Sequence, residues 1–458
     1  MENSVNLQEK AAMLIKAKRF AELKLILAEM NPADIAEFFK ELTSEELILA
    51  FRILPKDQAA DAFIEMDPEE QETLIRRFSD SELKAVVEDL FVDDAVDLLE
   101  EMPANVVKRI LRFTDVQTRN WINEILKYPE DSAGSIMTVE YVRLKKNMTV
   151  DQAIAHIRTT GVDKETIYTC YVTDLNNKLI GMISVRTLLL ADGNMIIEHL
   201  METNVISVST LEDKETVANA FNKYNFMAIP VVDDENRLLG IVTFDDAIDV
   251  LQEEATEDIE KMAAIIPSEK PYLRTGVWET WKQRIPWLLL LMVSATFTGG
   301  IISTFEGSLA SCVALTAFIP MLMDTGGNSG GQSSVTIIRS LSLGDVEMRD
   351  IFRIVFKECR VAVLCGITLA LVNFAKMMLL DRATIEADGQ NALLVALVVN
   401  LTLVVTIFCA KFVGSVLPIG AKKIGFDPAV MASPFITTIV DAISLLVYFN
   451  FAKIILHI

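Results

Sequence analysis

The last apolar stretch of the chain reads 430-VMASPFITTIVDAISLLVYFNFAKII-455 and is long enough to cross a bilayer as one helix. Its polar residues recur at steps of four, four, three and four, which places them on one helical face: Ser433, Thr437, Asp441, Ser444 and Tyr448. A carboxylate in the middle of such a helix costs on the order of 3 kcal/mol to insert. We therefore expect Asp441 to face a cavity or an ion path. The alternative is a protonated carboxyl group bonded to a neighbouring helix.

Four more apolar stretches precede this one, so residues 271–458 are predicted to form a membrane domain with five spans: 285–305, 308–338, 353–380, 391–418 and 430–455. Basic residues gather in two of the loops: Arg339, Arg349, Arg353, Lys357, Lys422 and Lys423. Because basic loops face the cytoplasm, we expect the N-terminal part of the chain inside the cell and the C-terminus outside. Asp324 is the only other acid expected within a span. No lysine or arginine is expected at the depth of Asp441.

The second stretch contains a glycine-rich run, 324-DTGGNSGGQ-332. Its glycines let neighbouring backbones approach closely. They also let a helix unwind and expose carbonyl groups at membrane depth. We expect the stretch to break at these glycines, with helix packing alone as the alternative.

Charge divides the chain in two. Residues 1–270 hold 52 acidic and 28 basic side chains, a net charge of −24, whereas residues 271–458 have a net charge of +2. A strongly acidic domain repels nucleic acid and anionic headgroups, and it attracts cations. The five cysteines lack CxxC spacing and the three histidines are far apart, which argues against a zinc site. No cleaved signal is expected at the start, MENSVNLQEK.

Residues 5–128 show helical spacing, and their prolines follow methionines at intervals of about 36 residues, at Pro32, Pro68 and Pro103. This period predicts stacked helical hairpins. Residues 131–250 then contain two similar units of strand, turn, strand and helix. The first holds 168-YTCYVT-173 and 178-KLIGMIS-184, and the second holds 228-AIPVVD-233 and 237-RLLGIVT-243.

An acidic amphipathic helix is predicted over 247–266, followed by a linker from Pro267 to Pro271. One of its faces carries a continuous anionic stripe: Asp246, Asp249, Glu253, Glu257 and Glu260. Like charges at this spacing destabilise an isolated helix. We therefore expect positive charge against this face, the alternative being a solvated surface.

The order of these parts resembles the MgtE family over essentially the whole chain, and the two α/β units resemble a tandem pair of CBS domains. The most recognisable segments are 325-TGGNSG-330 with Gln332, and 425-GFDPAV-430 leading to Asp441. The resemblance implies a multidomain fold. Its parts are an all-α superhelical domain (1–129), α/β CBS domains (130–199 and 200–246), a connecting plug helix with its linker (247–270) and an α-helical transmembrane pore domain with five spans (271–458).

The resemblance also implies a function. Family members are homodimers whose five-helix halves enclose one central pore, so the chain is expected to be a multi-pass cell-membrane (plasma or inner membrane) channel or transporter for Mg²⁺, not an enzyme. Mg²⁺ is then both substrate and regulator, closing the pore when it binds the acidic sensor. The implied pore residues are Asp441, Ser433, Thr437 and Asn328. The implied regulatory residues are Asp93, Asp97, Asp246, Asp249, Glu257, Asp258 and Asp427.

The sequence departs from the family pattern in places, and it leaves rival functions open. CBS domains often bind ATP or another adenine nucleotide, but Val185-Arg186-Thr187 lacks the acidic residue expected after the arginine to hold a ribose. Gly331 stands where some relatives carry an amide, and Ser433 precedes Pro434 where Asn-Pro is common.

An alternative function is a secondary exchanger of Mg²⁺ or another divalent cation such as Co²⁺ or Mn²⁺. A nucleotide-regulated membrane enzyme is disfavoured, because the sequence has neither a Walker motif nor a catalytic set.

Overall fold

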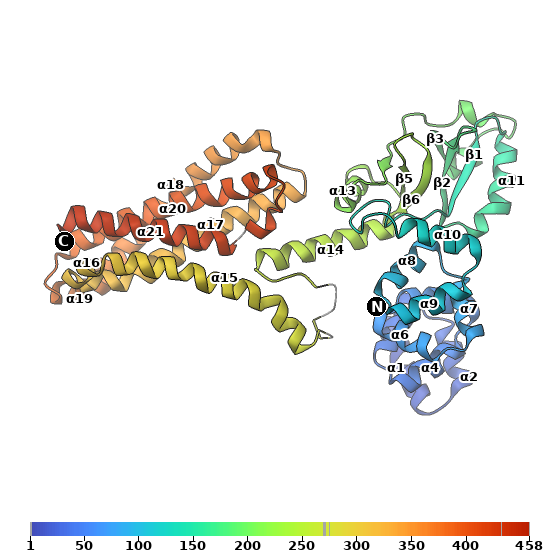
Figure 1. Cartoon of the computed structure of the whole chain (residues 1–458), viewed down its shortest axis with the longest axis horizontal. Helices are drawn as coiled ribbons and strands as arrows, with labels where there is room; N and C mark the ends of the chain where they lie inside the picture. The colour runs from blue at the N-terminus through green and yellow to red at the C-terminus, as the bar shows by residue number, and fades with distance from the viewer. Residues whose placement is uncertain (1, 269–271, 274, 432, 458) are drawn as a thin grey trace. The chain divides into compact units, whose positions relative to one another are not determined.

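The computed structural model describes residues 2–268, 272, 273, 275–431 and 433–457, with the side chains of all but residues 2–6, 56, 57 and 433. The chain divides into two compact units, Met1–Leu251 and Gln252–Ile458 (Figure 1). Each is described by itself below.

The first unit begins with ten short helices: α1 (Glu2–Lys16), α2 (Phe20–Leu27), α3 (Pro32–Lys40), α4 (Ser44–Ile53), α5 (Lys56–Ile64), α6 (Pro68–Arg77), α7 (Asp80–Val87), α8 (Val92–Glu101), α9 (Ala104–Phe113) and α10 (Val116–Ile125). Pro32 and Pro68 start α3 and α6 because proline suits the first helical turn. Thr43 and Ser79 form capping boxes at α4 and α7. Most contacts join helices two apart in the chain, such as α3 with α5 and α8 with α10, and α1 also packs on α2 and α6 on α9.

The all-helical prediction is confirmed, but the content of the repeat differs from the hairpins expected. Each 36-residue interval holds three helices, as in α3–α5 and α6–α8, because none of these six helices exceeds ten residues. The proline spacing gives the length of the repeat, but it does not give the number of helices within each repeat.

Two small sheets follow, and they confirm the tandem CBS prediction. The first contains β1 (Tyr141–Lys145), β2 (Thr166–Thr173) and β3 (Leu179–Ser184), with helices α11 (Val150–Thr160) and α12 (Val185–Leu190). The second contains β4 (Val208–Ser209), β5 (Ala228–Val232) and β6 (Leu238–Thr243), with α13 (Lys214–Tyr224). In each sheet the first strand pairs parallel and the last antiparallel. β1 and β4 have no distinguishing mark in the sequence, because a short strand that is joined to the next one through a helix has no turn signal.

The acidic helix is α14 (Phe244–Met262). It starts three residues earlier than predicted, directly after β6, and ends four residues earlier. Ala247 and Val250 pack into the core of the first unit, whereas residues from Gln252 onward belong to the second unit.

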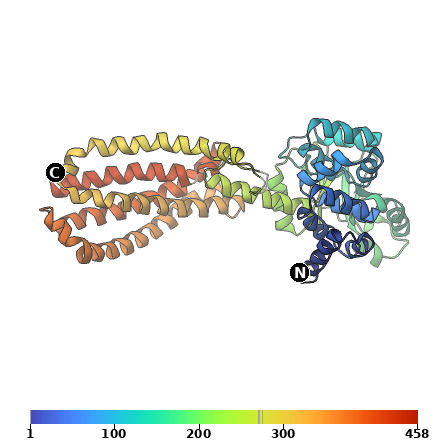
Figure 2. The same cartoon turned by 90° about the horizontal axis from the view of Figure 1, so that it is seen from below.

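The second unit is a helical bundle: α15 (Val277–Thr304), α16 (Glu306–Ser311), α17 (Ile319–Ser342), α18 (Ile351–Lys376), α19 (Arg382–Ala387), α20 (Ala392–Lys423) and α21 (Ser433–Leu456). Its long helices run side by side in both views (Figures 1 and 2), with α17 packed on α20 and α21, and α18 packed on α20. Four stretches of the described chain are long and apolar enough to span a membrane: Val277–Thr304, Met348–Ala387, Ala392–Lys423 and Ala429–Leu456.

The second predicted span is interrupted at a different place from the one expected. The break falls at Cys312 and the 3₁₀ segment Val313–Phe318, and α17 continues without interruption through the glycine run. The expectation that the glycines unwind the helix is therefore wrong. Glycine, serine, threonine and asparagine lower the hydropathy of α17, so it is absent from the four apolar stretches above.

Candidate functional site

The glycines of α17 allow two neighbouring helices to approach its backbone. A Cβ atom on Gly326 would lie 2.6 Å from Cγ2 of Thr406 on α20, and one on Gly330 would lie 2.6 Å from Cγ2 of Ile436 on α21. A Cβ on Gly414 of α20 would collide with the Gly330 carbonyl oxygen. The structure therefore supports the alternative interpretation of the glycine run, which is close packing of helices.

This packing places α17 beside the polar face of α21. A Cβ on Gly327 would lie 2.9 Å from Cγ2 of Thr437, whose hydroxyl donates to the Pro434 carbonyl at 2.9 Å. One helical turn on, Asp441 is half-buried and lies within electrostatic reach of Asp324 on α17. Two acids thus approach each other from two helices.

The other side of α17 is exposed and polar. Asp324, Asn328 and Gln332 lie there at steps of four, all accessible in the isolated chain. Of the predicted pore residues, Thr437, Asp441 and Asn328 therefore lie on the packed pair α17–α21, whereas the side chain of Ser433 is outside the described residues.

The polar stripe of α21 does not face one path along its whole length. Ser444 and Tyr448 are fully buried inside the second unit. Ser444 donates to the Val440 carbonyl at 2.6 Å, and Tyr448 donates to the Leu315 carbonyl at 2.9 Å. These two residues serve packing, and among the described side chains of the stripe Thr437 and Asp441 are the accessible ones.

Two ionisable residues inside the membrane helices were missed. Glu358 lies on α18, and Lys411 lies on α20 with 5% of its surface exposed. The expectation that Asp324 is the only further acid within a span is wrong, because Glu358 lies inside the apolar stretch Met348–Ala387. The expectation that no lysine or arginine lies at the depth of Asp441 stays a prediction. Lys411 directly follows Ala410, which packs against Ile436 and Val440 near the start of α21. A single basic residue in an apolar stretch hardly changes its hydropathy, so only its contacts identify it.

A separate cluster of carboxyl groups occurs within the first unit. It joins the N-terminal halves of α8 and α14 with two residues that precede strands. Its members are Asp93, Asp94, Asp97, Asp246, Glu140 and Glu165. Asp93 is 7% exposed and accepts a hydrogen bond from the Asp94 amide at 3.1 Å. The hydroxyl of Thr243 donates to Asp246 at 2.5 Å, and the Val92 amide donates to Glu140 at 2.9 Å.

The acids of this cluster raise one another's pKa values. Burial and the charge of Asp246 raise the pKa of Asp93 well above its usual range and that of Asp94 to about 7. The side chain of Asp97 is exposed, yet desolvation of its carboxyl group and the charge of Asp246 raise its pKa to about 7. Burial and the charge of Asp94 raise the pKa of Glu165 to about 8. Burial also raises the pKa of Asp246 to about 6, against the hydrogen bond from Thr243.

The cluster has the chemistry of a cation site. Oε2 of Glu165 is buried and has no hydrogen-bond partner among the described residues. No three His, Cys, Asp or Glu side chains in the described part of the chain converge tightly enough to chelate an ion directly. A cation here would keep part of its water shell, as Mg²⁺ usually does.

The C-terminal half of α14 makes a second set of polar contacts, within the second unit. Asp258 accepts a hydrogen bond from Ser342 of α17 at 2.9 Å. The Lys261 ammonium binds Asp427 at 2.7 Å and Glu257 at 2.5 Å, while Met262 packs on Ile338 and Ala429. Predicted regulatory residues Glu257, Asp258 and Asp427 thus lie together. The side chain of Asp249 on α14 is exposed, yet partial desolvation of its carboxyl group and the charge of Asp245 raise its pKa.

Comparisons with known proteins cover most of the chain. The profile of the MgtE divalent cation transporters matches residues 319–451, that of the MgtE intracellular N domain matches 9–131, and that of the CBS domain matches 133–194 and 197–253. The magnesium transporter MgtE of Thermus thermophilus is 36% identical over 439 residues, which are 95% of each chain. The chain belongs to the MgtE family.

Further relatives agree with this assignment of an MgtE transporter, which is not an enzyme. The magnesium transporter MgtE of Bacillus subtilis is 32% identical over 97% of this chain and 96% of its own. A solved structure of the cytosolic domain of the Mg²⁺ channel MgtE in complex with ATP is 36% identical, has a TM-score of 0.50, and covers 54% of this chain and 99% of its own. The family places the apolar helices of this chain in a membrane and its N-terminal domains in the cytosol.

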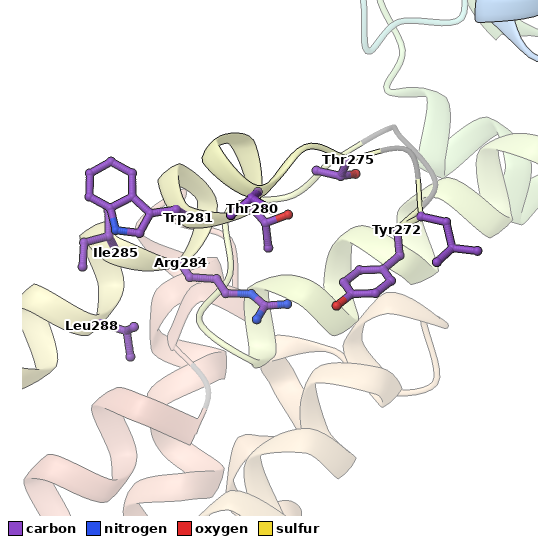
Figure 3. Close-up of a pocket in the computed structure, with 9 residues that line it drawn as sticks. Tyr272, Thr275, Thr280, Trp281, Arg284, Ile285 and Leu288 are labelled. Atoms are coloured by element: carbon purple, nitrogen blue, oxygen red, sulfur yellow. The ribbon is translucent and has the colours of Figure 1, made fainter.

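In this MgtE chain a hollow of about 560 Å³ lies at the start of α15 (Figure 3). It is lined by Tyr272, Leu273, Thr275, Val277, Thr280, Trp281, Arg284, Ile285 and Leu288. The Arg284 guanidinium points toward the side where Tyr272 lies. Aromatic and basic side chains at the end of an apolar helix are typical of a membrane surface.

The carboxyl cluster predicts a pH dependence of stability. The pKa values of its acids are raised in the folded state, so folding favours their protonated forms. Stability should therefore fall as the pH rises above about 4, until the loss is complete above about 8. In a soluble fragment that ends before α15, without divalent ions, the thermal midpoint should drop by about 5 °C between about pH 5.5 and pH 8.5. Added Mg²⁺ should reduce that drop, and a midpoint that rises with pH would contradict the assignment.

Proposed function

We propose that this MgtE chain is a Mg²⁺-selective, Mg²⁺-gated channel or transporter that works as a homodimer. The observation that carries the proposal is the pair of acids on packed helices, Asp441 on α21 and Asp324 on α17, beside the exposed polar face of α17. That face is polar, so its exposure to lipid would be energetically unfavourable. A second copy of the chain would cover it and enclose a polar path, with Asp441 from each chain lining a route for a hydrated ion.

Five spans complete the pore domain in this proposal, with α17 as the span shielded from lipid. The positive loops then face the cytoplasm and the C-terminus lies outside. A protein-enclosed helix tolerates a hydropathy below that of a lipid-facing one.

Closure follows from cation binding at two groups of acids. One is the carboxyl cluster of the first unit, and the other is the group of acids around the C-terminal half of α14. At high cytoplasmic Mg²⁺, ions bridging Asp93, Asp97 and Asp246 would hold the N-terminal helices on α14. Ions near Glu257, Asp258 and Asp427 would hold α14 on the cytoplasmic end of α17. When Mg²⁺ falls, the carboxylates repel and these contacts weaken. Ligand binding shifts such an equilibrium only by its preference for the closed form.

The contacts of Lys261 support a cation between Glu257 and Asp427, because its ammonium group bridges these two carboxylates. Replacing Lys261 with methionine should remove this internal cation. The carboxylates would then repel in the absence of Mg²⁺, while their affinity for Mg²⁺ would rise. Protection of α14 from proteolysis should therefore become more dependent on Mg²⁺, with weaker protection without the ion and full protection at saturation. Unchanged dependence on Mg²⁺ would contradict a shared site.

An adenine nucleotide, such as ATP, is proposed as a further ligand of the CBS pair, since a 36%-identical cytosolic domain has been solved with ATP. In the first CBS unit Thr187 takes the position of the expected acid, and its hydroxyl lies 2.9 Å from that of Ser184. Calorimetric titration of ATP tests whether this unit retains the site.

The function is tested by uptake into liposomes that contain the purified protein at graded internal Mg²⁺. Uptake that is fast at low internal Mg²⁺ and stops at high internal Mg²⁺ is the expected result. The second candidate is an exchanger that couples Mg²⁺ to another ion, which the buried ionisable pair Glu358 and Lys411 favours. Single-channel currents too large for a carrier would exclude it.

A further inference from the structure

Three membrane helices meet at a buried polar network. The Ser333 hydroxyl of α17 donates to Oε2 of Glu358 on α18 at 2.5 Å, and it accepts from Nζ of Lys411 on α20 at 3.1 Å. Nζ and Oε2 themselves are 3.7 Å apart. Ser333 is thus the bridging group of an ion pair, and α17 is held between the two charges.

Because the network is buried, each of its two charges needs a partner within the protein. The side chains of Lys411 and Glu358 are only 6% and 16% exposed. Each charge there depends on the other, because a buried ion that loses its partner is strongly destabilising, whereas neutralising both partners is often tolerated. The network therefore specifies a geometry more than it adds stability.

The rest of the α17 interface cannot specify that geometry equally well. At Gly326, Gly327 and Gly330 the nearest neighbours are methyl groups of Thr406, Thr437 and Ile436. Methyl contacts of this kind are apolar and include no directional bond. Such contacts specify the rotation of α17 less sharply than hydrogen bonds to charged groups do. Ser333 lies one residue after Gln332 and five after Asn328, which places it about 100° and 140° around the helix from them, on a buried side. Holding Ser333 in place thus sets the direction in which Asn328 and Gln332 point.

We propose that Glu358, Ser333 and Lys411 are positioning residues that set the rotation of α17, and with it the ion selectivity of the path. The inference rests on the proposed function, in which the exposed face of α17 lines that path. None of the three touches the ion. They act through the orientation of Asn328 and Gln332.

Four variants of the full chain test this inference in liposomes: Lys411→Met, Glu358→Gln, the double variant and Thr402→Val. Thr402 is the matched control, since it is fully buried on α20 but donates only within its own helix, to Val398 at 2.8 Å. Each single variant should change the Mg²⁺/Co²⁺ uptake ratio about fivefold or more per folded protein, by leaving one buried charge unpaired. The double variant, in which the glutamine can still accept from Ser333, should return to within about twofold of the wild type. Thr402→Val should match the wild type.

A measurement without transport separates failure of this inference from failure of the proposed function. A cysteine replacing Asn328 in a cysteine-free background is treated with a hydrophilic thiol reagent, and its labelling rate should change about tenfold when Lys411→Met is added. Unchanged labelling together with an unchanged uptake ratio overturns the positioning role while leaving the pore assignment intact. Absence of labelling in both backgrounds overturns the water-filled path, and the positioning role with it. Loss of folded protein in the single variants without recovery in the double variant also overturns the inference.

Discussion

Replacing Asp441 with asparagine should reduce Mg²⁺ flux by about 100-fold or more, because the amide keeps the shape of the side chain but removes the charge that attracts a hydrated Mg²⁺. Asp441 lies on the accessible part of the α21 stripe, near Asp324 of α17. Thr437, one turn away, supplies only a hydroxyl group. The measurement is the initial rate of Mg²⁺ uptake into liposomes at low internal Mg²⁺.

The control for this experiment is Asn450→Ala on the same helix. Asn450 is exposed, and its amide donates to the Leu446 carbonyl within α21 at 2.6 Å, so flux should stay near that of the wild type. Light scattering should find both variants in the same oligomeric state as the wild type. Normal flux through Asp441→Asn would exclude Asp441 as the pore carboxylate.

Converting Asp249, Glu257 and Asp258 to their amides should keep the protein conducting at internal Mg²⁺ concentrations that close the wild type. The closed form would lose cation bridges at α14, including those beside Asp427. Mg²⁺ would then bind the closed form less tightly and stabilise it less relative to the open form. We expect uptake at high internal Mg²⁺ to exceed that of the wild type by about tenfold, which corresponds to a lost coupling of roughly 1.4 kcal/mol. Flux at high internal Mg²⁺ is the quantity to measure.

A competing account holds that these acids only repel one another and so keep the pore open. On that account the same substitutions should close the pore, which gives the opposite sign at high internal Mg²⁺. The control removes three negative charges elsewhere, by amide substitution of Glu22, Glu72 and Glu88, whose partners are Arg19, Arg76 and Lys84 on the surface. Surface pairs contribute little, so this variant should close as the wild type does.

The sequence alone determined the features that depend on local pattern. Hydropathy located the apolar helices, two similar strand pairs located the CBS domains, and the four-residue steps of α21 singled out Asp441. Prolines marked helix starts, as at Pro32 and Pro68. These features can be read from a sequence because helix and strand periods relate residues only a few positions apart.

The tertiary structure decided everything that depends on distance between residues far apart in the chain. It brought Glu165 beside Asp94 and Asp246, and it used the glycines of α17 for packing where unwinding was expected. It also paired Lys411 with Glu358 through Ser333. Electrostatic attraction, repulsion and desolvation depend on separation in space and on burial, and spacing along the chain carries neither quantity.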